Sequence, residues 1–438
     1  MSPNPLTRRE FARRSLATAL GVSCYGSLPF LAAAAEQAKT KSCILLWMAG
    51  GPTQTDTFDL KVGHANGGPS KSIATAVEGI QISEHLPGVA RQMKDLAIIR
   101  SLTTQEGDHE RATRLMLTGH RPGQEGINYP SLGSLLSKEL GDESSDLPSY
   151  VCVSPFSVGN ADGPGFLGPN YAPLVVSGAS NDPEARANLS VENLSPPPGV
   201  SRESMQRRSA ISQFLQNDFA TRANSSSTRA HKANFDRAMR MVATNAKGAF
   251  RLDEEPAAIR DKYGRSRFGQ GCLLARRLVE RGAAFVEVAL EGWDTHSDNF
   301  NAVQRLCGTL DPGWSTLMDD LRERGLLQST LIVWMGEFGR TPKINGTTGR
   351  DHFPLAWSAV LGGGGIKGGQ AIGSTGPAGT EVADRPVKIA DFYATLCAGI
   401  GVNPETENIS PEGRPIPLVD RGGKVIQELA TPPARKQS

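Results

Sequence analysis

The chain has 438 residues, of which 38% are hydrophobic and 21% are charged, a composition typical of a globular protein and unlike that of a disordered or fibrous one. This length allows one large domain or two smaller ones, with a sizeable core in either case. The formal net charge is only +2, which gives no electrostatic reason to expect a nucleic-acid partner, and we predict none.

The start of the chain has the pattern of an export signal. The sequence LTRREF at residues 6–11 is a twin-arginine pattern, and an apolar, small-residue stretch follows it over residues 15–35. We therefore predict a twin-arginine signal peptide over residues 1–35 and a periplasmic or secreted protein. The apolar stretch is short for a transmembrane helix and is interrupted by Pro29, so we predict no stable membrane span after cleavage.

Short apolar runs bounded by turns predict the strands of a buried sheet. In chain order these are residues 43–48, 96–99, 150–153, 285–290, 330–335 and 357–361. Helical patterns cover residues 111–117 and 389–399, and a further helical region that ends near Arg324 is expected to break at Pro312. Strands that alternate with helices favour an α/β fold with a mostly parallel sheet covered on both faces.

The middle of the chain differs from the rest, and we predict a loop-rich and then helical insertion over about residues 155–265 within a main domain spanning 40–425. The basic pairs Arg207-Arg208 and Arg276-Arg277 are expected on solvated helical faces. Residues 426–438 are predicted to form a C-terminal tail. The cysteines that remain after the signal show no metal-binding or redox spacing, so we predict buried free thiols.

Polar clusters follow several predicted strands, at the sheet edge where ligands gather in such folds. Aspartate, glutamate and histidine side chains that converge there suit a divalent cation. The candidate ligands are Asp56, Asp294, His296, Glu337 and His352. Another cluster places His109 just before a helix. For each single histidine, a hydrogen-bonded structural role remains open.

Other chemistries lack their motifs. The chain contains no G-x-S-x-G sequence, so an α/β-hydrolase triad has no nucleophile, and it contains no G-x-x-x-x-G-K-[ST] phosphate loop. Residues 363–368 satisfy G-x-G-x-x-G, but turn-forming residues follow them instead of the helix that a dinucleotide site requires.

The order of the polar clusters resembles that of the alkaline phosphatase and sulfatase superfamily. It is more closely similar to one branch, the domain of unknown function 1501 family of sulfatase-like proteins with twin-arginine signals. The segments that carry the resemblance are LLWMAGGPTQTDTFDLK, HERATRLMLTGHRP, YGRSRFGQGCLLARRLVERG, GWDTHSDN, GEFGRTP, GRDHFP and VKIADFYATLCAGIGV. The resemblance implies an alkaline phosphatase-like three-layer α/β/α sandwich with a metal site at the carboxyl ends of its strands.

The resemblance also implies roles for individual residues. Asp294 and His296 resemble two ligands of one metal site that His352 completes, and Glu337 stands where the superfamily places an acid. Arg340 is expected to bind an anionic substrate.

The chain departs from the superfamily pattern at three places. The position of the sulfatase nucleophile falls on His109, for which the roles of nucleophile, metal ligand and base all stay open. Phe338 replaces a second metal ligand, and Asp56 arrives late after the first strand. We therefore expect one intact metal site and an eroded remnant of the other. Thr113 and Thr341 are weaker candidates for a substitute hydroxyl.

Together these observations favour an exported, metal-dependent hydrolase that acts on sulfate or phosphate esters. Its substrate would be an anionic ester, with sulfated polysaccharide fragments as one class, and its cofactor a divalent metal ion. The alternative is a non-catalytic cell-envelope binding or assembly protein that retains the fold and one metal, as expected if the nucleophile has been lost.

Overall fold

The computed structural model describes residues 42–142, 144–153, 163–177, 199–223 and 245–430, with isolated residues between 187 and 241. The predicted signal peptide, parts of the predicted insertion and residues 431–438 of the predicted tail lie outside this described part. Among the described helices, none is long and apolar enough to cross a lipid bilayer.

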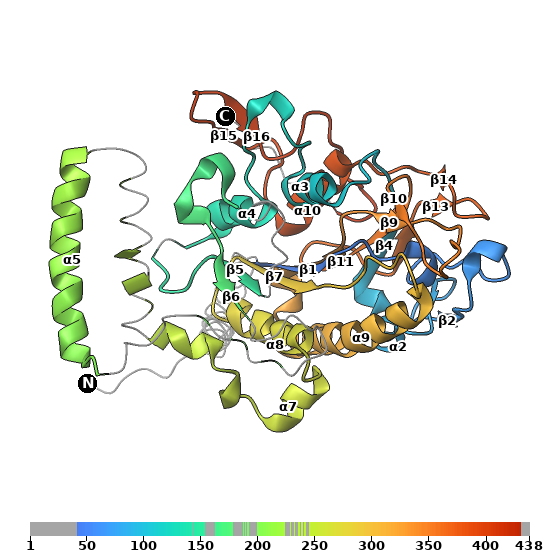
Figure 1. Ribbon diagram of the computed structural model, residues 1–438, viewed down its shortest axis with the longest axis horizontal. Coiled ribbons are helices and arrows are strands. Elements are labelled where there is room, and N and C mark those ends of the chain that lie inside the picture. The colour runs from blue at the N-terminus through green and yellow to red at the C-terminus, as the bar shows by residue number, and fades with distance from the viewer. Residues whose placement is uncertain are drawn as a thin grey trace, which may run out of the picture. The chain divides into compact units, whose positions relative to one another are not determined.

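An eight-stranded sheet with the order β12-β4-β11-β8-β1-β7-β5-β6 forms the centre of the fold (Figure 1). Its strands are β1 (Ser42–Met48), β4 (Leu96–Leu102), β5 (Tyr150–Val153), β6 (Leu174–Val176), β7 (Phe285–Leu290), β8 (Thr330–Met335), β11 (Trp357–Gly363) and β12 (Gln370–Ile372). All six predicted strands are confirmed. β1 pairs in parallel with β7 and β8, whereas β11 runs antiparallel to its neighbours β4 and β8. The sheet is therefore mostly parallel, as predicted.

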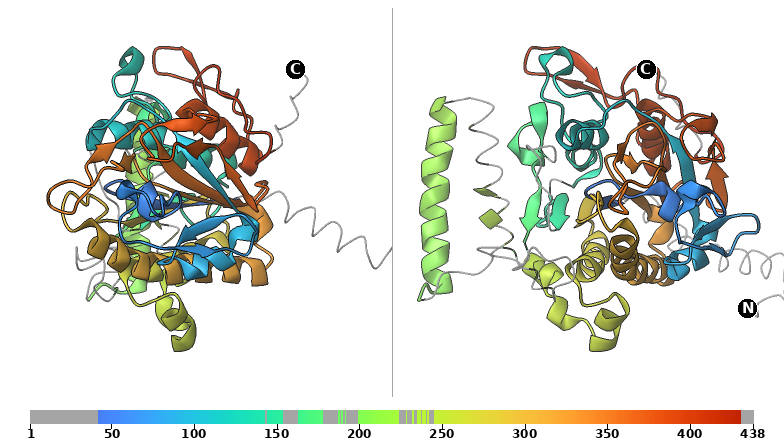
Figure 2. Two further views of the ribbon diagram at one scale, coloured as in Figure 1. Left: turned by 90° about the vertical axis from the view of Figure 1, so that its right-hand side faces the viewer. Right: turned by 45° about the vertical axis from the view of Figure 1, so that its right-hand side comes forward.

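Helices cover both faces of this sheet (Figures 1 and 2). They are α2 (Pro87–Arg91), α3 (His109–Thr118), α4 (Leu132–Leu140), α8 (Arg267–Val279), α9 (Asn299–Glu323) and α10 (Ile389–Ile400). Successive side chains of β1 alternate between two apolar cores. Ile44 and Leu46 pack in the core beneath α2, α8 and α9, and Leu45 and Trp47 pack in the core beneath α3, α4 and α10. The predicted three-layer α/β/α sandwich is confirmed.

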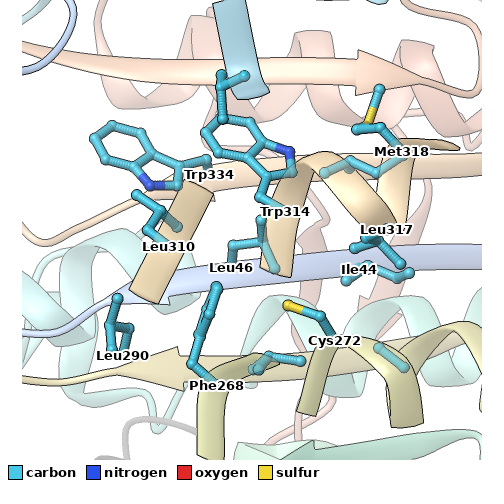
Figure 3. Close-up of a cluster of buried hydrophobic side chains, with 14 of the residues drawn as sticks. Ile44, Leu46, Phe268, Cys272, Leu290, Leu310, Trp314, Leu317, Met318 and Trp334 are labelled. Carbon is cyan, nitrogen blue, oxygen red and sulfur yellow. The ribbon is translucent and has the colours of Figure 1, made fainter. Parts of the chain in front are cut away.

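Helix α9 is continuous, so the predicted break at Pro312 is wrong. A proline inside a helix removes one backbone hydrogen bond and costs about 3 kcal/mol. Apolar side chains on both sides of Pro312, among them Leu310, Trp314 and Leu317, are fully buried, and each contributes roughly 1.5–3 kcal/mol (Figure 3). Trp314 also stacks on Trp334 of β8, with 6.1 Å between ring centroids. Packing against the sheet therefore outweighs the local preference.

The buried position of two arginines on α8 also differs from the prediction. Arg207 and Arg208 are exposed on α5 (Arg202–Ala223), as expected. Arg276 and Arg277 are instead buried, because Glu255 pairs with both guanidinium groups at 2.8 and 2.5 Å. The predicted solvated face at this pair is wrong. Glu255 precedes α7 (Ala257–Lys262), the short helix that follows it in the chain.

Four short antiparallel strand pairs in the described part of the chain form separate two-stranded sheets outside the eight-stranded sheet. They are β2 (Ser72–Ala74) with β3 (Gln81–Ser83), β9 (Gly339–Arg340) with β10 (His352–Phe353), β13 (Ser374–Thr375) with β14 (Val382–Asp384), and β15 (Glu407–Ile409) with β16 (Pro415–Pro417). In the β9–β10 pair, His352 lies opposite Arg340. The five described cysteines are buried free thiols, as predicted.

Candidate metal centre

The carboxyl ends of three adjacent strands bring together segments that are far apart in the sequence. β8, β1 and β7 are neighbours in the sheet, and they are followed by Glu337, Gly50 and Asp294 respectively. His109 enters as the first residue of α3, whose N-cap Asp108 accepts a hydrogen bond from the backbone N–H of Arg111. All of these segments end at one edge of the sheet.

Three imidazole Nε2 atoms gather around one carboxylate oxygen, Asp294 Oδ1. This oxygen is 3.4 Å from His109 Nε2, 3.4 Å from His352 Nε2 and 3.1 Å from His296 Nε2. His296 Nε2 also lies 3.0 Å from His352 Nε2. The structure therefore brings together four of the predicted site residues, His109, Asp294, His296 and His352.

The second ring nitrogen of each histidine is held by an acceptor. His109 Nδ1 is 2.7 Å from Glu337 Oε1, and His352 Nδ1 is 2.8 Å from the backbone carbonyl of Gly107. A carbonyl can only accept, so His352 carries its proton on Nδ1 and presents the Nε2 lone pair. His296 Nδ1 is 2.7 Å from Asp351 Oδ1. Protein acceptors on the outer ring nitrogen are the usual second sphere of metal-binding histidines.

The donor set fits a divalent cation. Two ligands that each lie about 2.1 Å from a tetrahedral ion are roughly 3.4 Å apart, which is the separation of Asp294 Oδ1 from His109 Nε2 and from His352 Nε2. The ligand atoms of His109, Asp294 and His352 all lie within 4.8 Å of one another. His109 Nε2 is buried and has no hydrogen-bond partner. A cation would give this nitrogen the partner it lacks.

Arg340 lies behind Asp294 and does not face solvent. Its side chain is fully buried, and it donates to Asp294 Oδ1 and to the backbone carbonyls of Gly50, Gly51 and Arg350. Burial alone would raise the pKa of Asp294, but the charge and hydrogen bond of Arg340 lower it below its ordinary value. Arg340 therefore keeps the carboxylate ionised and oriented, a different place from the substrate-facing one that the resemblance implied.

The surroundings shift the pKa values of two histidines in opposite directions. Burial acts to lower the pKa of His109, but the hydrogen bond and charge of Glu337 together with Asp294 raise it above its ordinary value. Burial lowers the pKa of His352, and the charges of Arg340 and His109 add to this effect. His352 is accordingly neutral, the form that binds metals, at neutral pH.

Gly50 lets the end of β1 approach the cluster closely. Its φ of +110° lies in the region that favours glycine, and a Cβ at this position would meet the backbone nitrogen of Asp294 at 2.4 Å. Its N–H donates to Glu337 Oε1 at 2.9 Å. Glu337, predicted as a ligand, thus uses that oxygen to position His109, and its other oxygen is buried without a hydrogen-bond partner.

The structure does not bring Asp56 to the cluster. Its buried carboxylate accepts hydrogen bonds from Thr53 Oγ1, Asn299 Nδ2 and Arg350, with Arg350 Nε at 2.7 Å from Oδ2. These contacts fill the role of a structural anchor. The backbone N–H of Arg350 in turn donates to the carbonyl of Thr295, between the two site residues Asp294 and His296.

One candidate hydroxyl is buried and the other is already hydrogen-bonded. Thr113 is buried on α3, and Thr341 donates to the carbonyl of Lys343 while it accepts from the backbone N–H of Asp351. Sequence reasoning missed the roles of Asp351 and of the Gly107 carbonyl. The sequence signal for Asp351 was its place next to His352 in the GRDHFP segment. The role of a backbone carbonyl cannot be predicted from residue identity.

Comparison with known proteins decides the family. A family model described as "Protein of unknown function (DUF1501)" matches residues 40–430. The chain belongs to this family. The resemblance drawn from the seven sequence segments is thereby confirmed, and the DUF1501 match spans all of the described part. No curated protein matches the sequence.

Several solved structures resemble this DUF1501 protein at low sequence identity. The PsFucS1 sulfatase from Pseudoalteromonas sp. is 15% identical, with a TM-score of 0.40, and the match covers 84% of this chain and 69% of that chain. A protein in the alkaline phosphatase superfamily from Vibrio parahaemolyticus is 13% identical, with a TM-score of 0.39 and coverage of 83% and 67%. The phosphonate monoester hydrolase of Agrobacterium radiobacter is 13% identical, with a TM-score of 0.33 and coverage of 89% and 77%.

Proposed function

We propose that this DUF1501 protein is a divalent-metal-dependent hydrolase of sulfate or phosphate esters. The observation that carries the proposal is the convergence of imidazole Nε2 atoms on Asp294 Oδ1 while each Nδ1 is held by an acceptor. Catalytic metal sites typically use three protein ligands and keep one position open. His109, Asp294 and His352 supply that number of ligands.

In this proposal His109, Asp294 and His352 would hold the cation, and its chemistry there would be Lewis-acid activation of an ester oxygen. Glu337 holds the His109 ring, and Arg340 holds the Asp294 carboxylate. The open side is accessible, because 47% of the Asp294 side chain and 45% of the His296 side chain are exposed. An anionic ester can therefore reach the centre from solvent.

We assign His296 to proton transfer, although the sequence suggested it as a ligand. Its Nε2 faces the centre, and Asp351 Oδ1 holds its Nδ1 at 2.7 Å. The hydrogen bond to His296 lowers the pKa of Asp351 below its ordinary value, so this carboxylate is ionised and accepts a hydrogen bond from His296 Nδ1. His296 can thus take up or release a proton at Nε2, as a general acid or base does.

We also propose where the protein acts and on which class of substrate. The LTRREF motif supports export of the folded protein by the twin-arginine route to the periplasm or beyond. Sulfated polysaccharide fragments are the proposed substrate class, and one similar solved structure is described as a complex with a neocarrahexaose.

Metal content is the first test. The purified protein should contain about one divalent ion per chain by elemental analysis. An Asp294→Asn, His352→Ala double variant should contain none, whereas an exposed double control, Lys71→Ser with Lys94→Ser, should match the wild type. Release of sulfate or phosphate from a panel of esters should depend on that metal. A metal-free wild type after loading, with no turnover, contradicts the proposal.

A non-catalytic binding protein is the second candidate. The specific observation in its favour is that the nucleophile position holds His109 and that both candidate hydroxyls, Thr113 and Thr341, are buried or already bonded. It predicts a bound metal without turnover of any ester in the panel, so the same experiment separates the two functions.

A further inference from the structure

A cavity of about 690 Å³ is lined by chain segments that lead into the metal centre. Residues 103–106 form one wall of it, and the next residue, Gly107, presents its carbonyl to His352. Leu355, three residues after His352, forms part of another wall, and the start of α10 forms a third. The cavity is therefore built from segments that also hold the metal ligands.

A second, smaller cavity of about 120 Å³ adjoins the first, since Gln124 and Asp420 line both. Its walls include His120 and Tyr129, whose rings stack with 3.8 Å between centroids. His120 is only 6% exposed, yet its Nδ1 has no hydrogen-bond partner. The unpaired ring nitrogen leaves His120 with unused hydrogen-bonding capacity in the wall of this cavity.

The charged residues that line the two cavities favour the binding of an anion. Two of the lining carboxylates are already paired, Glu106 with Arg111 at 3.0 Å and Glu125 with Arg414 at 2.7 Å. Among the described lining residues, three further cations then stand against the single carboxylate of Asp420; they are Arg121, Lys388 and Arg421. Lys388 is also the N-cap of α10 and makes no side-chain capping bond there.

The walls are apolar between these charges. Leu355, Ile389 and Ala390 line the first cavity, and Pro415 and Pro417 line the second beside the stacked rings. Apolar and aromatic walls with a few placed polar groups suit a ring-containing ligand, whereas a compact inorganic ion would leave them uncovered.

We infer that these two cavities form one groove that binds the non-reacting sugars of a polyanionic oligosaccharide, with Arg121 and Lys388 contacting its second anionic group and the His120–Tyr129 pocket holding a distal ring. This inference rests on the proposed function, and it deepens that function by making the substrate a chain instead of a small monoester. Binding energy from the distal part would then add to that at the metal centre.

The test compares heparin-derived disaccharide and hexasaccharide, with binding measured by microscale thermophoresis and sulfate release measured in the same samples. The wild type should bind the hexasaccharide at least tenfold more tightly than the disaccharide. An Arg121→Ser, Lys388→Ser variant removes two charge-assisted contacts and should lose about tenfold or more in hexasaccharide affinity alone. Serine is a favourable N-cap residue, so α10 should fold in this variant.

Two further variants and one further probe test whether binding depends on this groove and on the sugar rings. Lys71→Ser with Lys94→Ser makes the same change of net charge at exposed lysines elsewhere and should bind like the wild type. Tyr129→Leu should weaken hexasaccharide binding and leave disaccharide binding unchanged. Inorganic polyphosphate, which has the charge without the rings, should bind less tightly than the hexasaccharide.

Any one of three results would overturn the proposed groove. They are equal affinity for the two oligosaccharides, wild-type affinity in the Arg121, Lys388 double variant, and polyphosphate binding as tight as that of the hexasaccharide. Ester turnover without any of these effects would leave the proposed function standing alone. Groove-dependent binding without turnover of these fragments or of any ester in the panel would instead support the groove and overturn the hydrolase.

Discussion

Asp56 and Arg350 form a fully buried ion pair in which Arg350 Nε lies 2.7 Å from Asp56 Oδ2 and Nη2 lies 3.1 Å from Oδ1. The two residues are distant in the sequence, and neither touches solvent. Arg350 is followed directly by Asp351 and His352, and its backbone binds Thr295 between Asp294 and His296. The pair thus ties both loops of the candidate metal centre to the segment that follows β1.

Removal of the acid from this pair should be strongly destabilising. Asp56→Ala leaves the Arg350 guanidinium buried without its counter-charge, and we expect a loss of about 3–5 kcal/mol in the free energy of unfolding. Chemical denaturation checks this. Asp218→Ala, which breaks an exposed pair with Arg222 on α5, should change stability by less than about 0.5 kcal/mol. Similar small effects of both substitutions would mean that the buried pair is not an anchor.

Glu337 should control metal affinity without being a ligand. Glu337→Ala removes the acceptor that fixes the His109 ring, and second-sphere losses of this kind typically weaken metal binding about 10–100-fold. Titration of the metal-free protein with Zn²⁺ by calorimetry measures the change. Glu337→Gln keeps an acceptor oxygen and should lie between the wild type and the alanine variant. Complete loss of binding in Glu337→Gln would instead assign Glu337 to the first coordination sphere.

His296 should separate turnover from metal content. If it transfers protons, His296→Ala should retain the metal and lose about 10²–10⁴-fold in kcat for ester hydrolysis. Asp351→Asn should also lower kcat, since it removes the carboxylate that holds the His296 ring through Nδ1. Elemental analysis of both variants accompanies the kinetics. A His296→Ala protein that has lost its metal would show that His296 is a ligand.

The buried network around Glu255 should make stability fall at acid pH. Burial acts to raise the pKa of Glu255, but its bonds to Arg276 and Arg277 hold the pKa below its ordinary value of 4.5. A carboxyl with a depressed folded-state pKa contributes stability above the unfolded-state pKa, and this contribution disappears as the pH falls through the folded-state value.

Denaturation midpoints measured from neutral pH down to below 4.5 check this. Glu255→Gln should be less stable than the wild type at neutral pH and should show a smaller loss on acidification. Parallel curves for the two proteins would exclude Glu255 as the source of the pH dependence.

The sequence was most informative where the signal is local. Each predicted strand is a buried apolar run, and the polar residues after β7 and β8 reach a common edge because parallel neighbours end together. The sequence also marked His109 and His352. The cluster that they form with Asp294 follows from the strand order, which only the structure shows. The resemblance to a known family had implied a metal site shared by Asp294, His296 and His352.

Local sequence was insufficient where partners come from distant segments. Asp56 has a carboxylate and follows the first strand of the sheet, as a metal ligand would. Only its contact with Arg350 shows that it is a structural anchor. Arg276 and Arg277 resemble a solvated pair until Glu255 is placed against them. In each case a charge that would be costly to bury alone is buried because its counter-charge arrives by tertiary packing.

The burial of the cysteines has a consequence for how this protein would survive in an oxidising compartment. Cys43, Cys152, Cys272 and Cys307 have no exposed surface, and Cys397 has 4%. Burial raises the pKa of Cys397 to about 12, so its reactive thiolate is scarce. A chain that crosses the membrane already folded would carry its thiols sealed in the two cores, whereas one that crossed unfolded would expose all five to mispairing. Under the twin-arginine export that we propose, folding before translocation would protect these thiols without disulfide chemistry.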